Sequence, residues 1–479
     1  MGLAYTYMGI VNVLIYGSAV CLNTLCSQAM GAKNYKLAGH WLQLALITLT
    51  VTSIPVIASF FYVAPVLKFF VKAGPGAEYT YAQRDALCER AGAYSRRMAL
   101  TVWPVACYCA IRQYFQAQGI VWPATVVSCA AAVVNVGFNW LLIHGVGSWR
   151  GLGFLGSPLA TFSAIIFQLV AFLLYACWWK RLHVKTWPGF ALRHWKAACA
   201  RARVRTFLAQ ALPYAFYMGC DEWAYEIITL LAGEMGPDQV STQSVLFTLW
   251  GLLWAIFWGF GLATQIRVGE HLGAGAPRRA RRAAMLGCAC AGAVSLLAAA
   301  LTALLRRYVV ELFSSDAAVL RVTESVLPIF VLSFLSSVLA LSIGAVLEGM
   351  GRPGVLAVIA FVASWCVLLP TAWGLAFDKR LWGTGKASMK GLWWGSVAGE
   401  TVRWTLCGLT LCRVKWAEMA KQARERSEVA KRKKDDGDGE GVDGGADEAG
   451  RAAAASATAS PVLGPASPRL PPRQQAAEV

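Results

Sequence analysis

Apolar runs of about twenty residues or more recur along the chain, separated by short polar or charged stretches. A helix needs about 20 mostly apolar residues to cross the hydrocarbon core of a bilayer. Because lipid offers no hydrogen-bonding partners, each run must satisfy its own backbone as a helix. The pattern predicts an all-α polytopic membrane protein with about eleven spanning helices. Their expected positions are residues 3–30, 39–61, 98–118, 122–143, 158–179, 207–233, 241–268, 283–305, 317–348, 355–377 and 392–412.

The longest basic stretch, Lys180–Arg205, separates five of these runs from the other six. We therefore expect an N-lobe of five helices at residues 1–180 and a C-lobe of six helices at 207–413. Residues 181–206 are expected to form a basic cytosolic linker. Within this linker, 193–206 is either an amphipathic helix on the membrane surface or solvated chain.

From residue 414 the composition changes from a basic, helix-prone stretch to acidic Gly-rich and then Ala/Ser/Pro-rich sequence. Such sequence buries too little apolar surface to offset the entropy of ordering it. We therefore expect residues 414–479 to be a disordered cytosolic tail.

Composition agrees with a membrane protein, since 57% of the 479 residues are hydrophobic and only 15% are charged. A soluble domain carries about a quarter of its residues as charges. The net charge of +18 is concentrated in the tail and in alternate loops, as expected if these loops face the cytosol. The loop Lys68–Arg97 departs from that rule. The charge is thus explained by topology, and we expect no nucleic-acid partner.

Eleven helices with a cytosolic C-terminus would place Met1 on the other side of the membrane, although no signal peptide is visible. We therefore expect that an N-terminal helix is missing from this sequence. The 14 cysteines include no C-x-x-C spacing, and most lie in apolar runs, where cysteine acts as a small hydrophobic residue. We expect no disulfide framework, zinc site or cofactor.

The two halves of the chain share short motifs in the same order. Met30–Ala32 is echoed by Leu272–Ala274, and Gln116–Gly119 by Glu348–Gly351, in both cases about 240 residues later. Equivalent loops fall on the same side of the membrane, so the sequence predicts a duplicated bundle with parallel repeats. Two such lobes would leave a central cleft between them.

Three acids and two aromatic residues interrupt the apolar run 207–233, within Cys220–Glu226. A carboxylate in a membrane helix is costly and usually faces the bundle interior or a water-filled cavity. Helical spacing places Asp221 on the same face as Tyr225, and Glu222 on the same face as Glu226. The cluster is therefore expected to face a substrate path.

Such carboxyl groups can exchange a proton for a cationic solute, which is the minimum requirement for antiport. Trp223 and Tyr225 offer ring faces to an organic cation, each worth roughly 0.5–2 kcal/mol. In the alternative interpretation, one acid only pairs with a basic residue from another helix. Arg403 is a candidate, although Glu400 at i,i+3 is its nearer partner in sequence.

Four separated motifs resemble the multidrug and toxic compound extrusion (MATE) family, in its eukaryotic branch. They are Leu25–Ala32, Gln118–Pro123, Glu222–Glu226 and Arg267–Gly275. The resemblance runs in order through most of the apolar part of the chain. It implies twelve helices in two six-helix lobes, of which this chain lacks the first. It also implies an antiporter that expels organic cations or other amphiphilic solutes in exchange for protons or sodium.

The resemblance assigns roles to individual residues. Glu226 matches a family acid, and either Asp221 or Glu222 matches a second acid, depending on the alignment. Trp254 lies where the family often has an aromatic residue. Asn23 and Gln28 line the cleft or cap a helix end. Two further acids of the pattern are replaced here by Thr248 and Ser337, and Asn23 itself stands where the family often has Asp.

Three alternatives remain open at this point: a lipid-linked precursor flippase of the same superfamily, a truncated remnant that does not transport, and an intramembrane enzyme. A flippase predicts a cationic cleft, whereas this cluster is acidic. An enzyme needs a metal or nucleophile constellation, and the five histidines form no H-x-x-x-H pattern. We therefore expect a transporter rather than an enzyme, in the plasma membrane or in a vacuolar or other organellar membrane.

Overall fold

The computed structural model of the chain describes residues 2–71, 80–312, 316–378 and 387–435. Residues 1–431 form one compact unit. The described residues are predominantly helical, and the regular elements are α1 (Gly2–Gly31), α2 (Tyr35–Phe60), α3 (Val63–Phe70), α4 (Tyr81–Gln116), α5 (Trp122–His144), η1 (Gly153–Leu155), α6 (Gly156–Leu173), η2 (Leu174–Trp179), α7 (Leu192–Ala198), α8 (Arg201–Glu234), α9 (Pro237–Gly273), α10 (Pro277–Leu304), α11 (Arg306–Glu311), α12 (Ala317–Gly349), α13 (Pro353–Ala360), η3 (Phe361–Leu368), α14 (Leu369–Phe377), α15 (Met389–Cys412) and α16 (Trp416–Asp435).

Eight helical segments among the described residues are long and apolar enough to cross a membrane. Three further long helices, α4, α8 and α15, contain more charged residues and complete the eleven runs expected from the sequence. The segments η2 and η3 are π-helical continuations of α6 and α13. The predicted all-α membrane fold is confirmed.

Two helix boundaries differ from the prediction. The helix α4 begins at Tyr81 instead of Met98, because Thr80 and Gln83 form a capping box at its start. The helix α8 begins at Arg201, so the end of the expected linker is already helical. A surface helix was considered for residues 193–206. The structure has instead a short helix of seven residues, Leu192–Ala198, followed by the start of α8.

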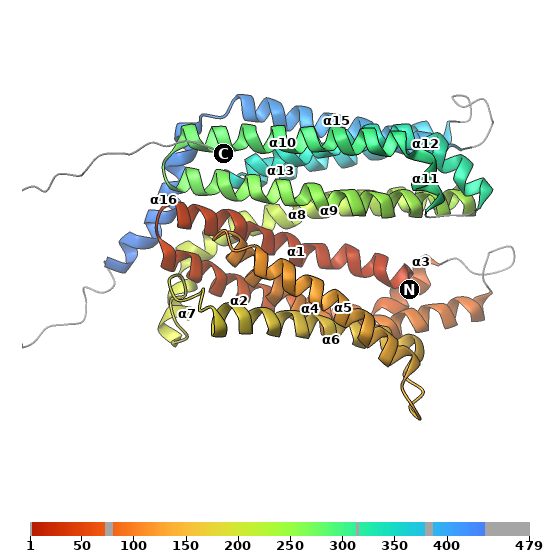
Figure 1. Ribbon diagram of the computed structural model, residues 1–479, viewed down its shortest axis with the longest axis horizontal. Coiled ribbons are helices and arrows are strands. Elements are labelled where there is room, and N and C mark those ends of the chain that lie inside the picture. The colour runs from red at the N-terminus through yellow and green to blue at the C-terminus, as the bar shows by residue number, and fades with distance from the viewer. Residues whose placement is uncertain (1, 72–79, 313–315, 379–386, 436–479) are drawn as a thin grey trace, which may run out of the picture. The chain divides into compact units, whose positions relative to one another are not determined.

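The helices pack in two groups, as Figure 1 shows. In the first group α1, α2, α4, α5 and α6 pack on one another, and in the second α9, α10, α12 and α15 do so, with α13 against α8. The groups meet mainly where α1 packs against α8 and α9. These are the two helical lobes expected from the sequence.

The turns that follow α1 and α9 are built alike, as the internal repeat requires. In each turn the helix ends in bonds of the i→i−4, i→i−3 and i→i−5 types, at positions about 240 residues apart. In each turn one residue has a positive φ, 58° at Lys33 and 69° at Gly275. The equivalent donor and acceptor pairs are Ala32–Gln28, Lys33–Met30 and Asn34–Ala29 in the first turn, and Ala274–Glu270, Gly275–Leu272 and Ala276–His271 in the second.

The ends of α1 and α9 approach each other with approximate two-fold symmetry. A Cβ atom at Gly31 would overlap the carbonyl oxygen of Glu270, and one at Gly273 would overlap that of Gln28. These two contacts are related by the repeat, so each lobe supplies the same glycine and the same facing carbonyl. We call this region the α1–α9 contact. It needs glycine because the two backbones touch.

The helix α16 corrects the expectation of a disordered tail over its first part. Its buried face, which includes Met419, Ala420 and Ala423, packs on the lobes. Arg426 Nη2 donates to the Met350 carbonyl (2.9 Å), at the end of α12, and Asn34 Nδ2 donates to the Ser427 carbonyl (3.1 Å). This apolar stripe and the carbonyl groups left at helix ends order a segment whose overall composition suggested disorder. The rest of the predicted tail, 436–479, lies outside the described residues.

Candidate functional site

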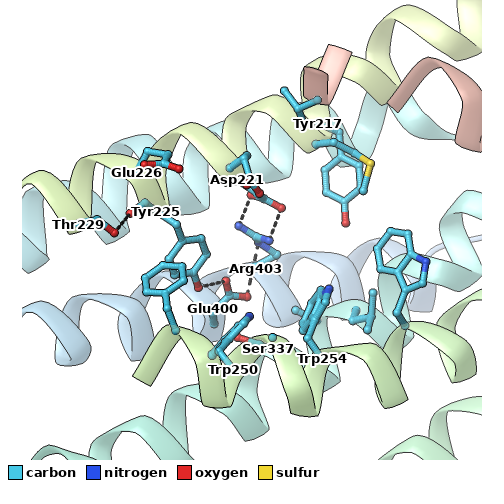
Figure 2. A pocket seen from close by; sticks show the side chains of 18 of the residues that line it. Tyr217, Asp221, Tyr225, Glu226, Thr229, Trp250, Trp254, Ser337, Glu400 and Arg403 are labelled. Atoms are coloured by element: carbon cyan, nitrogen blue, oxygen red, sulfur yellow. Dashed lines mark hydrogen bonds and ion pairs between the residues drawn. The ribbon is translucent and has the colours of Figure 1, made fainter. Parts of the chain in front are cut away.

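A cavity of about 500 Å³ lies in the C-lobe on the side that faces α1. Its walls are formed by α8, α9, α12 and α15 (Figure 2), and Val13 of α1 also lines it. Its lining is both acidic and aromatic. The residues that line it include Tyr217, Asp221, Glu222, Tyr225, Glu226, Gln243, Phe247, Trp250, Trp254, Trp258, Ser337, Glu400 and Arg403.

The acidic cluster predicted from the sequence supplies much of one wall. Asp221, Glu222, Tyr225 and Glu226 of α8 all line the cavity, and one oxygen of Glu226 lies near the backbone of α1. Trp223 is two residues from both Asp221 and Tyr225, which turns it about 200° away around the helix. Its Nε1 donates to the Ile10 carbonyl of α1 (3.0 Å), so this side chain joins the lobes and does not line the cavity.

Asp221 is held by an arginine. Arg403 of α15 donates from Nη1 and Nη2 to the two carboxylate oxygens, at 2.6 and 2.5 Å. Ser364 of η3 donates to Asp221 Oδ1 (3.0 Å) and accepts from Arg403 Nη2 (2.7 Å). The neighbouring Trp365 Nε1 donates to the Cys220 carbonyl (3.2 Å), so the π-helical segment is fixed to α8 beside the ion pair. The sequence left open that one acid of the cluster pairs with Arg403. The acid that does so is Asp221.

A second acid faces this pair from α15. The Glu400 side chain is buried, with the residue 2% exposed, and its Oε1 accepts from the Tyr225 hydroxyl (3.1 Å). Its Oε2 lies 3.7 Å from Arg403 Nε, a longer contact than the arginine makes with Asp221. Ser337 of α12 lies beside it (Figure 2). Ser337 stands where the family pattern has an acid. Glu400 thus supplies a carboxyl group beside that position.

Aromatic rings form the opposite wall of the cavity, on α9. The rings of Trp250 and Trp254 stack with centroids 5.8 Å apart and planes 18° from parallel. Trp250 also lies 5.8 Å from the Tyr225 ring, which connects this wall to α8. Thr248 is exposed, donates to the Ser244 carbonyl (2.8 Å) and does not line the cavity. The wall can therefore offer ring faces to a cation bound between α8 and α9.

A second cavity of about 460 Å³ adjoins the first on the side of the N-lobe. Asn12 and Tyr16 of α1 contribute to its lining. Met218 and Glu222 line both cavities, so the Glu222 carboxylate lies at the boundary between them. Unlike Asp221, Glu222 is exposed and has solvent-accessible space on two sides.

Asn23 and Gln28 line neither cavity. Gln28 Nε2 donates to the Gly349 carbonyl (2.9 Å), which joins α1 to the end of α12. Asn23 is fully buried in α1 nearby. Their positions fit a structural role at the end of the helices, the second possibility left open by the sequence.

Sequence reasoning missed Trp250 and named Glu400 and Arg403 only as a rival explanation. A charge inside an apolar helix was the signal used for α8, and the same signal marks Glu400 and Arg403 in α15. Trp250 lies one turn before Trp254 on the same face of α9 and could have been found from that spacing.

Comparisons with known proteins agree with this architecture. A family model described as MatE matches residues 1–141 and 213–373, more than half of the chain. The chain is 29% identical over 412 residues to multidrug and toxin extrusion protein 2 of Mus musculus, covering 86% of this chain and 67% of that protein. It is 30% identical to an uncharacterized transporter of Schizosaccharomyces pombe, covering 86% and 72%.

Solved structures show the same fold. The eukaryotic MATE transporter AtDTX14 superposes with a TM-score of 0.77 at 25% identity, covering 89% of this chain and 90% of that one. A MATE family transporter solved in an outward-facing conformation has a TM-score of 0.72 at 16% identity. The matched family and the curated relatives reported above consist of transporters rather than enzymes. The chain belongs to the MATE family of multidrug and toxin extrusion transporters.

Proposed function

We propose that this protein is a secondary antiporter that exports organic cations or other amphiphilic solutes in exchange for protons. The observation that carries the proposal is the C-lobe cavity, where an acidic face on α8 lies opposite an aromatic face on α9. Its volume of about 500 Å³ falls in the range of small-molecule sites, roughly 300–1,000 Å³.

Glu222 and Glu226 are the proposed exchange groups. Both line the cavity. Asp221 is bonded through both carboxylate oxygens to the guanidinium of Arg403. A cationic solute and a proton compete for the same carboxylate, so protonation from one side of the membrane releases the solute and solute binding from the other side displaces the proton. Tyr225 and Trp254 would contact the bound cation through their ring faces.

The closed α1–α9 contact suggests the direction of access. It lies at the same end as α16, where the basic residues of the loops and the start of the tail are concentrated. By the positive-inside rule we assign this end to the cytosol. The conformation described here would then be closed to the cytosol, and the cavity would exchange solute with the opposite side.

The flippase alternative is less well supported by the cavity lining. A pyrophosphate-linked substrate requires a cationic cleft, whereas this lining includes four acids and a single arginine, which is itself paired with Asp221.

The test is ethidium exchange in proteoliposomes that contain the purified chain, driven by an imposed proton gradient. We expect gradient-dependent ethidium movement in the wild-type protein, its loss in Glu226→Gln, and its retention in Thr248→Ala, a matched control on α9 outside the cavity. A sodium gradient in place of the proton gradient identifies the alternative coupling ion. No ethidium movement under either gradient would contradict the proposal and favour the non-transporting remnant.

A further inference from the structure

The four carboxyl groups of the cavity have different surroundings. Both oxygens of Asp221 accept hydrogen bonds from one guanidinium, and Oδ1 also accepts from Ser364. The side chains of Arg403 and Asp221 are only 10% and 23% exposed. Glu222, by contrast, is exposed and lines two cavities.

The guanidinium of Arg403 is well suited to remain where it is. Its planar fork matches the two oxygens of a carboxylate, and it stays charged because arginine does not deprotonate in proteins. Its charge is also attached to α15 through the side chain, so it cannot leave the cavity as a proton or a metal ion can. Ser364 contacts both members of the pair and orients them.

We propose that Arg403 is a permanent, tethered cation at Asp221, occupying the position that an exchangeable proton or metal ion would take there. Asp221 therefore takes no part in ion exchange, and Arg403 is a specificity-determining residue that excludes Asp221 from the exchangeable carboxylates of the cavity. The inference rests on the proposed antiport function and refines it. It also assigns a different role to Asp221, which the sequence had grouped with the coupling acids.

The groups around the pair are consistent with this assignment. On α8 the titratable neighbours are Tyr217, Cys220, Glu222, Tyr225 and Glu226, and on α15 they are Glu400 and Cys407. In the remaining walls the nearest polar groups are neutral: Ser364 on η3, Ser337 on α12, and Gln243 and Ser244 on α9. Among the described lining residues, Arg403 is thus the one basic side chain available to neutralise an acid.

The first experiment counts titrating carboxyl groups in the purified full chain by infrared difference spectroscopy between acidic and alkaline buffers, with no substrate present. All proteins compared carry Glu400→Gln, because Arg403 also lies 3.7 Å from that acid and its removal would change both groups. In this background we expect Arg403→Gln to gain one titrating carboxyl, and the double variant Asp221→Asn/Arg403→Gln to show the same number as the background protein. The double variant removes both charges, so it keeps the test valid if the single variant, with a buried unpaired acid, fails to fold.

A carboxyl lost from the double variant relative to the Glu400→Gln background would overturn the inference, because Asp221 would then titrate while Arg403 is present. An unchanged number of titrating carboxyl groups in Arg403→Gln would also overturn the inference. If the ion pair had only a structural role, both variants would lose thermal stability. The number of titrating carboxyl groups would not rise in Arg403→Gln and return in the double variant. The measurement needs no transport activity, so it remains informative if the wild-type chain fails to move ethidium and the antiport proposal fails.

The second experiment uses ethidium exchange in proteoliposomes. We expect Arg403→Ala to lose coupled exchange, and the double variant Asp221→Asn/Arg403→Gln to recover proton-gradient dependence relative to Arg403→Ala. Added guanidinium chloride at millimolar concentration should restore exchange in Arg403→Ala, whereas sodium chloride at equal ionic strength should not. Loss of proton dependence in the double variant would show that Asp221 is a coupling group and would refute the proposal.

Discussion

The cavity and the α1–α9 contact both lie where the lobes meet or near that surface, yet they use polar groups in different ways. The cavity keeps acids and aromatic rings around open space. The contact is held mainly by hydrogen bonds between buried neutral groups: Gln265 Nε2 donates to Thr24 Oγ1 (3.1 Å) and to the Tyr214 hydroxyl (2.8 Å), and Thr24 Oγ1 donates to the Glu348 carbonyl (2.8 Å). The Glu348 side chain is also buried there, beside Tyr214.

The difference has a physical reason. Neutral amide and hydroxyl bonds and glycine-mediated backbone packing can form and break with modest cost, since no unpaired charge is left buried. The acids of the cavity line open space, where water, a proton or a solute can satisfy them. A contact that must open and close is therefore built mainly from glycines and neutral side chains, and a region that must bind cations is rich in acids. Variants at each region test this division.

The largest effect is expected from a bulky side chain in the α1–α9 contact. In Gly273→Leu the new side chain would overlap the Gln28 carbonyl, so the contact could not close as observed. Overpacking of this kind costs about 1–3 kcal/mol and occasionally more. We expect ethidium exchange to be abolished while the protein still elutes as a folded monodisperse species. Gly292→Leu is the matched control, because a Cβ there meets open space; equal loss in both variants would contradict the contact's role.

A smaller effect is expected when one polar bond of the contact is removed. Gln28→Ala leaves the Gly349 carbonyl without its donor, at a cost of about 1–3 kcal/mol for a buried group. We expect a lower midpoint of thermal unfolding and a slower exchange rate, with unchanged ethidium affinity because Gln28 lies outside the cavity. A change in affinity without a change in stability would place Gln28 in the substrate path instead.

In the cavity, Trp254→Ala should weaken binding without breaking the fold. The stacked ring pair with Trp250 offers a face worth roughly 0.5–2 kcal/mol to a cation, which corresponds to an affinity loss of about 2- to 30-fold. Ethidium titration of the purified protein measures this loss. Trp254→Phe should retain much of the affinity, and Trp178→Ala, at an exposed tryptophan, should have no effect on it. Equal affinities in Trp254→Ala and wild type would exclude the aromatic wall from binding.

The smallest effect is expected at α16. Arg426→Ala removes the bonds from the half-exposed guanidinium to the Met350 and Gly351 carbonyls, on the side of the contact that faces α16. Differential scanning fluorimetry should show a small decrease in thermal stability. Lys421→Ala is the control. The Lys421 side chain is 77% exposed, and its Nζ lies 3.9 Å from Oε1 of Glu425 on the same helix. A stability loss as large in the control would mean that α16 contributes through helix propensity rather than through these bonds.

Much of the fold could be predicted because it depends on local pattern. Run lengths located the helices, and two short motifs about 240 residues apart indicated the repeat that the matching turns at Lys33 and Gly275 display. The three acids and Tyr225 of the polar cluster on α8 line a cavity, as the cost of placing charged side chains in lipid leads one to expect. The helix positions and the placement of the acids beside a cavity follow from the lipid bilayer, because hydrocarbon excludes polar groups wherever they occur along a membrane helix.

The identity of each partner could not be predicted from sequence. Glu400 is closer to Arg403 along the chain, yet the arginine bonds Asp221, because the packing of α15 against η3 and α8 brings both carboxylate oxygens within reach of its fork. Trp223 was expected in the binding wall, but the rotation of α8 directs it to Ile10 of α1.

The sequence by itself therefore determined the membrane-spanning helices, the duplicated lobes and the family, since these depend on hydrophobic periodicity and on motifs a few residues long. Only the tertiary structure decided which acid is neutralised, which rings face the cavity, and that the start of the tail folds back as α16. Those outcomes depend on the relative rotation and height of helices far apart in the chain, and a bidentate ion pair or a glycine contact forms only when that placement is accurate to a fraction of a helical turn.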